Sequence, residues 1–105
     1  MDHYKATKVV IITEMIILDK VARVIELAGA RGYTVTPAGG KGSRNVRSSS
    51  RASVVDELRN IKIEVITSSK EAANRIADEV AEKFFENYSG ITYLEEVEIL
   101  RPHKF

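Results

Sequence analysis

The chain has 105 residues, of which 44% are hydrophobic and 30% are charged, with 16 Lys and Arg against 15 Asp and Glu. This composition is typical of a globular protein, and the length predicts a single domain with one small core. The absence of cysteine excludes disulfide bonds, thiolate metal sites and thiol catalysis, and it favours a reducing compartment. A net charge of +1 argues against a generally basic nucleic-acid-binding protein, so any basic site must be local.

Neither a membrane span nor a signal peptide is predicted. The longest apolar runs, Val9–Ile12 and Met15–Leu18, are far shorter than the ~20 residues that cross a bilayer. No long apolar stretch follows a basic start at the N-terminus. We therefore expect a soluble, cytoplasmic protein that reaches a membrane only through a partner.

The first third of the chain predicts a strand, a helix and a second strand. Residues 8–13 form a β-branched run typical of a central strand that is buried on both faces. The next apolar residues recur at helical spacing, with Asp19 as the candidate N-cap and Gly29 or Gly32 as the end. This helical stripe consists of Leu18, Val21, Ala22, Ile25 and Ala28. Residues 33–36 alternate as a second strand, and Pro37 weakens any continuation of it.

A glycine- and serine-rich segment follows, from Gly39 to about Ser53. It contains no acid and one large apolar residue, Val46, and its four cations are Lys41, Arg44, Arg47 and Arg51. Such a segment cannot bury enough apolar surface to offset its ordering entropy, so we expect a flexible loop. Loops longer than ~12 residues in a compact domain are usually functional or disordered.

The second half predicts a strand, a helix and a last strand. Residues 61–67 alternate cleanly as a strand, and Ser68 and Glu71 have the spacing of a capping box. The apolar stripe of the helix that follows is Ala73, Ile76, Ala77, Val80, Ala81 and Phe84. Residues 87–90 interrupt the pattern, and residues 93–100 form the last strand, with Val97 and Ile99 on one face.

This order of elements, β-α-β-β-α-β, predicts an α+β, ferredoxin-like fold. In that fold a four-stranded antiparallel sheet carries two helices on one face. Because the strands are so apolar, the other face must also be covered. Association of subunits through their sheets is the natural solution.

The sequence offers no catalytic or metal-binding constellation. His3 and His103 stand alone near the two ends of the chain, and Ser48–Ser50 have no histidine base nearby in the sequence. Glu95 and Glu96 are neighbours on a predicted strand, so they point to opposite faces and cannot share one site.

The glycine-rich segment is the strongest local signal, and it is compatible with anion binding. Gly39, Gly40 and Gly42 would let backbone N–H groups converge on an anion, while Arg44 and Arg47 offer planar forks for phosphate oxygens. A P-loop is excluded because glycine follows the lysine where serine or threonine is required. On composition alone, a solvated loop that keeps the protein soluble remains an equal alternative.

Four segments resemble the PII signal-transduction superfamily: Val9–Glu14, Gly32–Val35, Gly39–Ser48 and Tyr88–Ile91. The nearest resemblance is to its SbtB branch, the cyanobacterial PII-like regulators of the bicarbonate transporter SbtA. The resemblance implies a homotrimer that binds cyclic AMP, AMP, ADP or ATP in the clefts between subunits. It also implies a T-loop, here about residues 39–58, that reports the bound nucleotide to the cytoplasmic face of the transporter and inhibits bicarbonate uptake in the carbon-concentrating mechanism.

The same resemblance assigns roles to individual residues. The nucleotide-binding residues would be Gly39, Gly40, Lys41, Gly42, Ser43, Arg44, Arg47 and Gly90. Of these, Arg44 and Arg47 would contact the phosphate, and the bare backbone of Gly90 would admit the adenosine. The partner-binding residues of the T-loop would be Ser43, Arg44, Asn45, Val46 and Arg47.

Departures from the family pattern limit these expectations. The segment before the last strand is not the Gly-Lys-rich phosphate loop of ordinary PII proteins, and the C-terminus lacks the cysteine loop of some SbtB proteins. We therefore expect neither tight binding of ATP with 2-oxoglutarate nor redox-linked hydrolysis, and no resident cofactor or metal; whether a divalent ion accompanies ATP is left open. The domain would span residues 1–105, with tails at 1–6 and 101–105. The alternatives are a small nucleotide-hydrolysing enzyme on the same fold and a general PII-type protein of nitrogen or carbon signalling.

Overall fold

The structure is a computed structural model that describes residues 2–39 and 59–100 of the chain. Its elements follow the predicted β-α-β-β-α-β order, with a short 3-10 turn before the first helix. In chain order they are β1 (Tyr4–Glu14), η1 (Met15–Ile17), α1 (Leu18–Leu27), β2 (Thr34–Ala38), β3 (Asn60–Thr67), α3 (Lys70–Phe84) and β4 (Gly90–Ile99). The α+β, ferredoxin-like fold is therefore confirmed.

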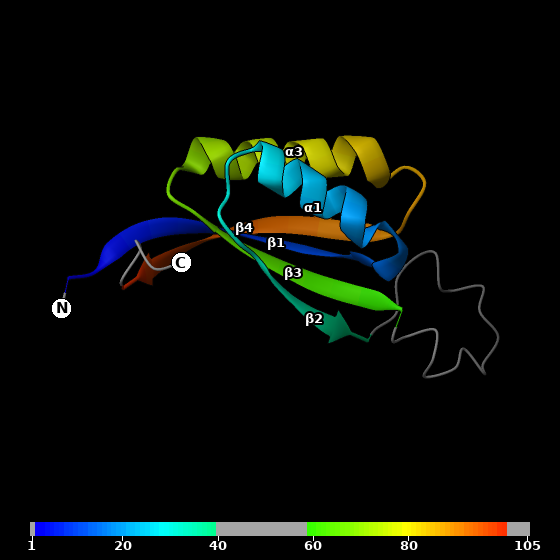
Figure 1. Cartoon of the computed structure of the whole chain (residues 1–105), viewed down its shortest axis with the longest axis horizontal. Helices are drawn as coiled ribbons and strands as arrows, with labels where there is room; N and C mark the ends of the chain where they lie inside the picture. The colour runs from blue at the N-terminus through cyan, green and yellow to red at the C-terminus, as the bar shows by residue number, and fades with distance from the viewer. Residues whose placement is uncertain (1, 40–58, 101–105) are drawn as a thin grey trace.

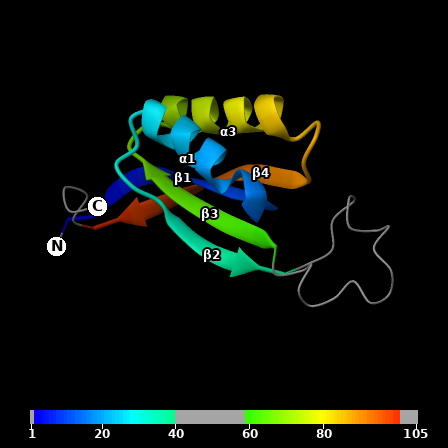
Figure 2. The ribbon, with the colours of Figure 1, turned by 45° about the vertical axis from the view of Figure 1, so that its right-hand side comes forward.

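The four strands form one antiparallel sheet in the order β2-β3-β1-β4. The described helices α1 and α3 lie on the same side of this sheet, and this holds in two views (Figures 1 and 2). Among the described residues no element covers the opposite face, which we call the open face. The sheet and helices therefore make two layers, as the sequence predicted.

The central position of β1 explains its run of β-branched residues. It pairs with β3 on one side and with β4 on the other, and Val9, Val10 and Ile11 are completely buried. By alternation Val9 and Ile11 face the helices, so the buried Val10 lies on the open face. The predicted central position is therefore confirmed, whereas burial on the open face is complete only at Val10, because Lys8 and Ile12 are partly exposed.

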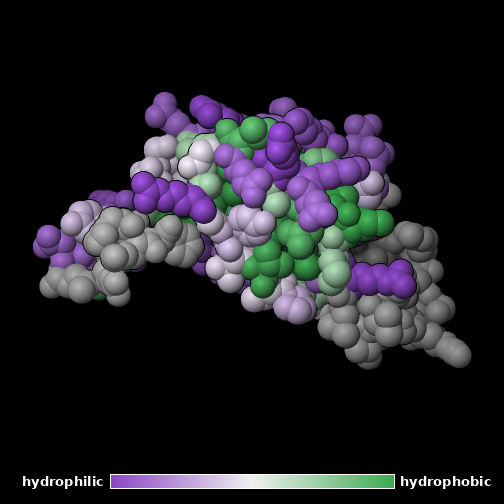
Figure 3. All heavy atoms as spheres, viewed as in Figure 1, coloured by the Kyte–Doolittle hydropathy of each residue, from purple (hydrophilic) through white to green (hydrophobic). Residues whose placement is uncertain are grey.

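The core lies between the sheet and the two helices. The predicted alternation of β3 is confirmed, because Ile61, Ile63, Val65 and Thr67 are buried while the residues between them are only partly so. The helices contribute the buried residues Val21, Ala22, Val24 and Ile25 from α1 and Ala73, Ile76 and Val80 from α3. Charged residues cover the outer side of the helices, and hydrophobic residues come to the surface between α1 and β2 (Figure 3).

The ends of several elements differ from the sequence predictions. Asp19 is not an N-cap but lies in the first turn of α1, because the chain enters that helix through η1. The cap of α3 is Ser69 rather than Ser68: its hydroxyl accepts a hydrogen bond from the backbone N–H of Ala72 at 3.1 Å. The predicted capping box of Ser68 and Glu71 is therefore wrong, because the helix is capped one residue later, by Ser69. The positive φ of 90° at Gly29 confirms it as the residue that turns the chain after α1.

All four strands are longer than predicted, and β3 gains one residue because it begins at Asn60. β2 continues through Pro37 to Ala38, which an edge strand tolerates because one side of its backbone makes no ladder bonds. β4 begins at Gly90 instead of residue 93. β1 begins at Tyr4, so residues 4–6, which the sequence assigned to a tail, pair with residues 97–99 of β4 and extend beyond β3 as a two-stranded arm (Figure 1).

No helix in residues 2–39 or 59–100 is long and apolar enough to cross a membrane.

Candidate functional site

Two residues of the predicted nucleotide site lie within the described ranges, Gly39 and Gly90, and both lie at one end of the sheet. Glu14 at the end of β1 pairs with Asn60 at the start of β3, and Asn60 pairs with Ala38 at the end of β2. On the other side of β1, Thr13 pairs with Gly90. Gly39 directly follows Ala38, so the backbone positions of Gly39 and Gly90 lie at the same end of the sheet (Figure 1).

The segment that leads into β4 is fastened to the end of β1. The hydroxyl of Thr13 donates to the backbone carbonyl of Ser89 at 2.7 Å, and Thr13 is only 2% exposed. A carboxylate oxygen of Glu14 accepts the backbone N–H of Ser89 at 2.7 Å, and the hydroxyl of Ser89 lies 3.4 Å from the same oxygen. We call this arrangement the Glu14–Ser89 clasp. It holds the entry to β4 in one conformation through two side chains of β1.

The neighbouring strand is anchored at the same place. The backbone N–H of Met15 donates to the carbonyl of Arg59, the residue before β3, at 2.6 Å. The segment between β2 and β3 therefore rejoins the sheet directly beside the clasp. Sequence reasoning did not identify Thr13, Glu14 or Ser89 as a unit, since hydrogen bonds between residues 75 apart leave no local pattern.

Gly90 has a packing role that the sequence did not indicate. A methyl group added at its Cα would lie 2.6 Å from Cζ and 2.8 Å from Cδ1 of the Phe85 ring, with Cε1 closer still. A side chain at Gly90 would thus force the Phe85 ring of the same chain to move. Its proposed contact with adenosine remains a prediction.

The remaining predicted site residues lie almost entirely outside the described ranges. Gly39 is described and exposed, at the end of β2. The others between β2 and β3 are outside the described residues, namely Gly40, Lys41, Gly42, Ser43, Arg44, Asn45, Val46 and Arg47. Their roles in nucleotide and partner binding therefore stay predictions.

A charged cluster crosses the middle of the open face. The ammonium group of Lys8 lies 3.3 Å from carboxylate oxygens of both Glu64 and Glu95, and that of Lys62 lies 3.7 Å from Glu64. Hydrogen bonds to Glu64 and then Glu95 raise the pKa of Lys8 above its usual value. This cluster joins β3, β1 and β4 and places charge on a face that is otherwise rich in apolar residues.

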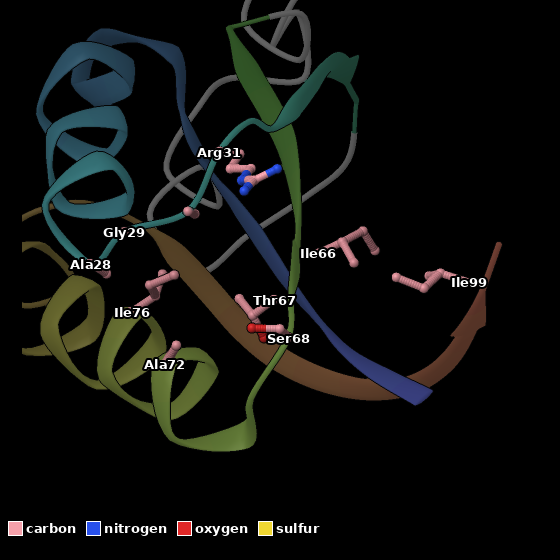
Figure 4. Close-up of a pocket in the computed structure, with 10 residues that line it drawn as sticks. Ala28, Gly29, Arg31, Ile66, Thr67, Ser68, Ala72, Ile76 and Ile99 are labelled. Carbon is pink, nitrogen blue, oxygen red and sulfur yellow. The ribbon is translucent and has the colours of Figure 1, made fainter. Parts of the chain in front are cut away.

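A hollow of about 420 Å³ opens at the opposite end of the sheet, where α1 passes into β2 and β3 into α3. Its lining is mostly apolar, with Arg31, Thr67 and Ser68 as polar contributors (Figure 4). Within residues 2–39 and 59–100, no group of three or more His, Cys, Asp or Glu side chains is arranged to hold a metal ion. His3 lies 3.2 Å from Glu98, far from the clasp in the register of the sheet.

Comparison with known proteins identifies the family to which this chain belongs. The family model of nitrogen regulatory protein P-II matches residues 6–104. The chain therefore belongs to the P-II family, and it is a PII-like signalling protein.

Solved structures agree with this assignment. A protein of Thermus thermophilus described as a PII-like signalling protein is 37% identical, with a TM-score of 0.80, and the match covers 100% of this chain and 99% of that one. CPII from Thiomonas intermedia K12, bound to ADP and bicarbonate, is 27% identical, with a TM-score of 0.78 and coverage of 99% and 97%. A further structure of CPII, bound to ADP, AMP and bicarbonate, matches at 24% identity with a TM-score of 0.75 and coverage of 96% and 99%.

Proposed function

We propose that this protein is an adenine-nucleotide sensor whose ligand binds at the end of the sheet that carries the Glu14–Ser89 clasp. The observation that supports this most directly is the convergence of Gly39 and Gly90, the two described members of the predicted site, on that one end. The relative at 27% identity was solved with ADP bound, which supports an adenine nucleotide as the ligand.

In this proposal the cationic segment between β2 and β3 supplies the phosphate contacts. Arg44 and Arg47 would pair with phosphate oxygens, while Gly39, Gly40, Lys41, Gly42 and Ser43 would present backbone and side-chain groups around them. Charge-assisted hydrogen bonds of this kind contribute about 1.5–3 kcal/mol each. A nucleotide that binds one conformation of the segment better than another would shift the population of that segment by its differential affinity.

A homotrimer would complete the site and cover the open face. That face leaves Tyr4 at 47%, Ile91 at 58% and Tyr93 at 40% exposure, which is a large apolar surface for a small monomer. Packing of subunits against one another would bury these side chains and form clefts between neighbouring subunits where nucleotides could bind.

The partner we propose is a sodium-dependent bicarbonate transporter of the SbtA type. The residues offered to it are Ser43, Arg44, Asn45, Val46 and Arg47, and cyclic AMP would join AMP, ADP and ATP as a regulatory ligand. The protein would then act in the cytoplasm and be recruited to the inner membrane only through the transporter. The string from Gly39 to Ser48 is the feature that favours this SbtB-type assignment.

A second candidate is a PII-type carbon signal that senses bicarbonate itself. This is favoured by the relative that was solved with both ADP and bicarbonate bound. The two candidates differ in whether the inorganic carbon species is the cargo of a partner or a ligand of this chain.

Calorimetric titration with cyclic AMP, AMP, ADP and ATP, each with and without bicarbonate, tests both candidates. Each titration is followed by capture of a detergent-solubilised transporter on the immobilised protein. Nucleotide binding together with nucleotide-dependent capture supports the transporter regulator, whereas heat of bicarbonate binding without capture favours the second candidate. If none of the four nucleotides binds, the sensor function is refuted.

The variant Arg47→Ala tests the phosphate contact. We expect at least tenfold weaker binding of AMP, because one charge-assisted interaction worth about 1.5–3 kcal/mol is lost. Arg23→Ala on α1, exposed and on the helical layer, is the matched control that removes the same charge elsewhere. An unchanged affinity for AMP in Arg47→Ala would exclude the phosphate role.

A further inference from the structure

The carboxylate of Glu14 accepts a hydrogen bond from a backbone N–H group at the entry to β4, that of Ser89. Glu14 Oε2 accepts the Ser89 N–H at 2.7 Å, and the hydroxyl of Ser89 lies 3.4 Å from it. A phosphate-binding loop works through free backbone N–H groups that point at the anion. Here one such group, at the position that precedes Gly90, is already satisfied by a side chain with a negative charge.

Glu14 also stands between the two parts of the proposed nucleotide site. Its strand, β1, lies between β4, which begins at Gly90, and β3, whose first residue, Asn60, pairs with Ala38 of β2. Neighbouring strands are about 4.8 Å apart, so about 10 Å separate the backbones of Ala38 and Glu14. A ligand that contacts Gly39 and Gly90 of the same subunit therefore crosses the end of β1.

The side chain of Glu14 belongs to the open face of the sheet. Residues alternate along a strand, and Val9 and Ile11 point into the core between sheet and helices. Glu14 has the opposite parity and is partly exposed. The carboxylate is therefore available to influence a ligand that lies over the open face at this end.

We infer that Glu14 is a specificity-determining residue that disfavours nucleotides with more than one phosphate group. This inference rests on the proposed nucleotide site. Each additional phosphoryl group adds negative charge, and a like charge held within a few ångströms at a partly desolvated site costs binding free energy. The fixed carboxylate would thus select AMP over ADP and ATP, while the clasp keeps the loop before β4 in place.

A purely structural role for Glu14 makes a different prediction, and Glu14→Gln separates the two. Glutamine retains a side-chain oxygen that can accept the Ser89 N–H, so the clasp is kept while the charge is removed. A structural role predicts unchanged selectivity in this variant, because the loop stays in place. The electrostatic role predicts that ATP gains affinity relative to AMP.

The experiment is a set of calorimetric titrations with AMP, ADP and ATP in magnesium-free buffer. For the wild-type protein we expect affinity to fall from AMP to ADP to ATP; tightest binding of ATP would overturn the inference without any variant. For Glu14→Gln we expect the ratio of the ATP to the AMP dissociation constant to fall about tenfold, and an unchanged ratio would also overturn it.

Two control variants isolate the contribution of the Glu14 charge. Glu82→Gln, on the exposed side of α3, changes the net charge equally and should leave the ratio unchanged; a matching drop there would assign the effect to global charge and overturn the inference. Thr13→Val removes only the bond to the Ser89 carbonyl, so it should alter AMP and ATP affinity by the same factor. Failure of the wild-type protein to bind any of the three nucleotides would refute the proposed function itself, whereas binding with an unchanged ratio in Glu14→Gln would defeat only the role of Glu14.

Discussion

Replacing Gly90 with alanine should destabilise the protein through Phe85. The added methyl carbon would lie 2.6 Å from Cζ of the ring, about 0.9 Å short of the ~3.5 Å at which carbon atoms attract one another best. Because the ring is only partly buried, it can move, so the cost should fall in the lower part of the range of about 1–3 kcal/mol for overpacking. We expect a loss of about 1–2 kcal/mol in the free energy of unfolding.

Two other glycines provide matched controls for this substitution. An alanine methyl at Gly32 would meet nothing within 4 Å, so Gly32→Ala should be neutral or stabilise by about 0.4–1 kcal/mol through the unfolded chain. Gly29 also has open space but a φ of 90°, so Gly29→Ala should cost about 1–2 kcal/mol from backbone strain alone. Steric and conformational reasons for glycine are thus separated within one chain.

The assay is urea unfolding followed by circular dichroism at one fixed protein concentration, with thermal unfolding as a second measurement. A change of about 1 kcal/mol should move the thermal midpoint by about 4–8 °C in a domain of this size. A double-mutant cycle with Phe85→Leu identifies the cause, since the penalty at Gly90 should shrink when the ring is absent. An equal penalty in both backgrounds would refute the role of Phe85 in excluding a side chain at Gly90.

Two further substitutions test the helix cap and the open face. Ser69→Ala should lower the free energy of unfolding in urea by about 1 kcal/mol, because the N–H of Ala72 loses its acceptor. Ser68→Ala should have little effect on the same quantity. A larger loss in Ser68→Ala than in Ser69→Ala would favour Ser68 as the cap. The pKa of Lys8 is raised in the folded protein, so its ion pairs stabilise the fold fully below its unfolded pKa of about 10.4 and lose this effect as the pH rises through the folded value. When the pH is raised through this window, Lys8→Met should therefore lose less stability in urea unfolding than the wild type, and parallel pH profiles would contradict this.

Hydrophobic periodicity was sufficient to predict the arrangement of the fold. The alternation of Ile61, Ile63 and Val65 and the helical spacing of Ile76 and Val80 each correspond to one buried face. These patterns are local, because a strand repeats about every 2 residues and a helix about every 3.6. The order of such segments then left few topologies that would bury all of them.

The ends of the elements could not be predicted from local pattern in the same way. The chain that enters α3 is held by a contact with β1, because the hydroxyl of Thr67 at the end of β3 donates to the backbone carbonyl of Thr7 at 2.9 Å. The true length of β1 depends on its pairing with residues 97–99 of β4. Each of these contacts joins parts of the chain that only the folded sheet brings together.

Composition and periodicity were thus enough to predict the two-layer architecture and the cationic segment between β2 and β3, and the resemblance of four segments to a known superfamily predicted the family. Three contacts emerged only from the folded chain: Glu14 clasps Ser89, Phe85 excludes a side chain at Gly90, and Lys8 lies between Glu64 and Glu95. The physical reason is that strand register brings together side chains distant in sequence. Their hydrogen bonds and steric contacts then depend on distances of a few ångströms that no local pattern encodes.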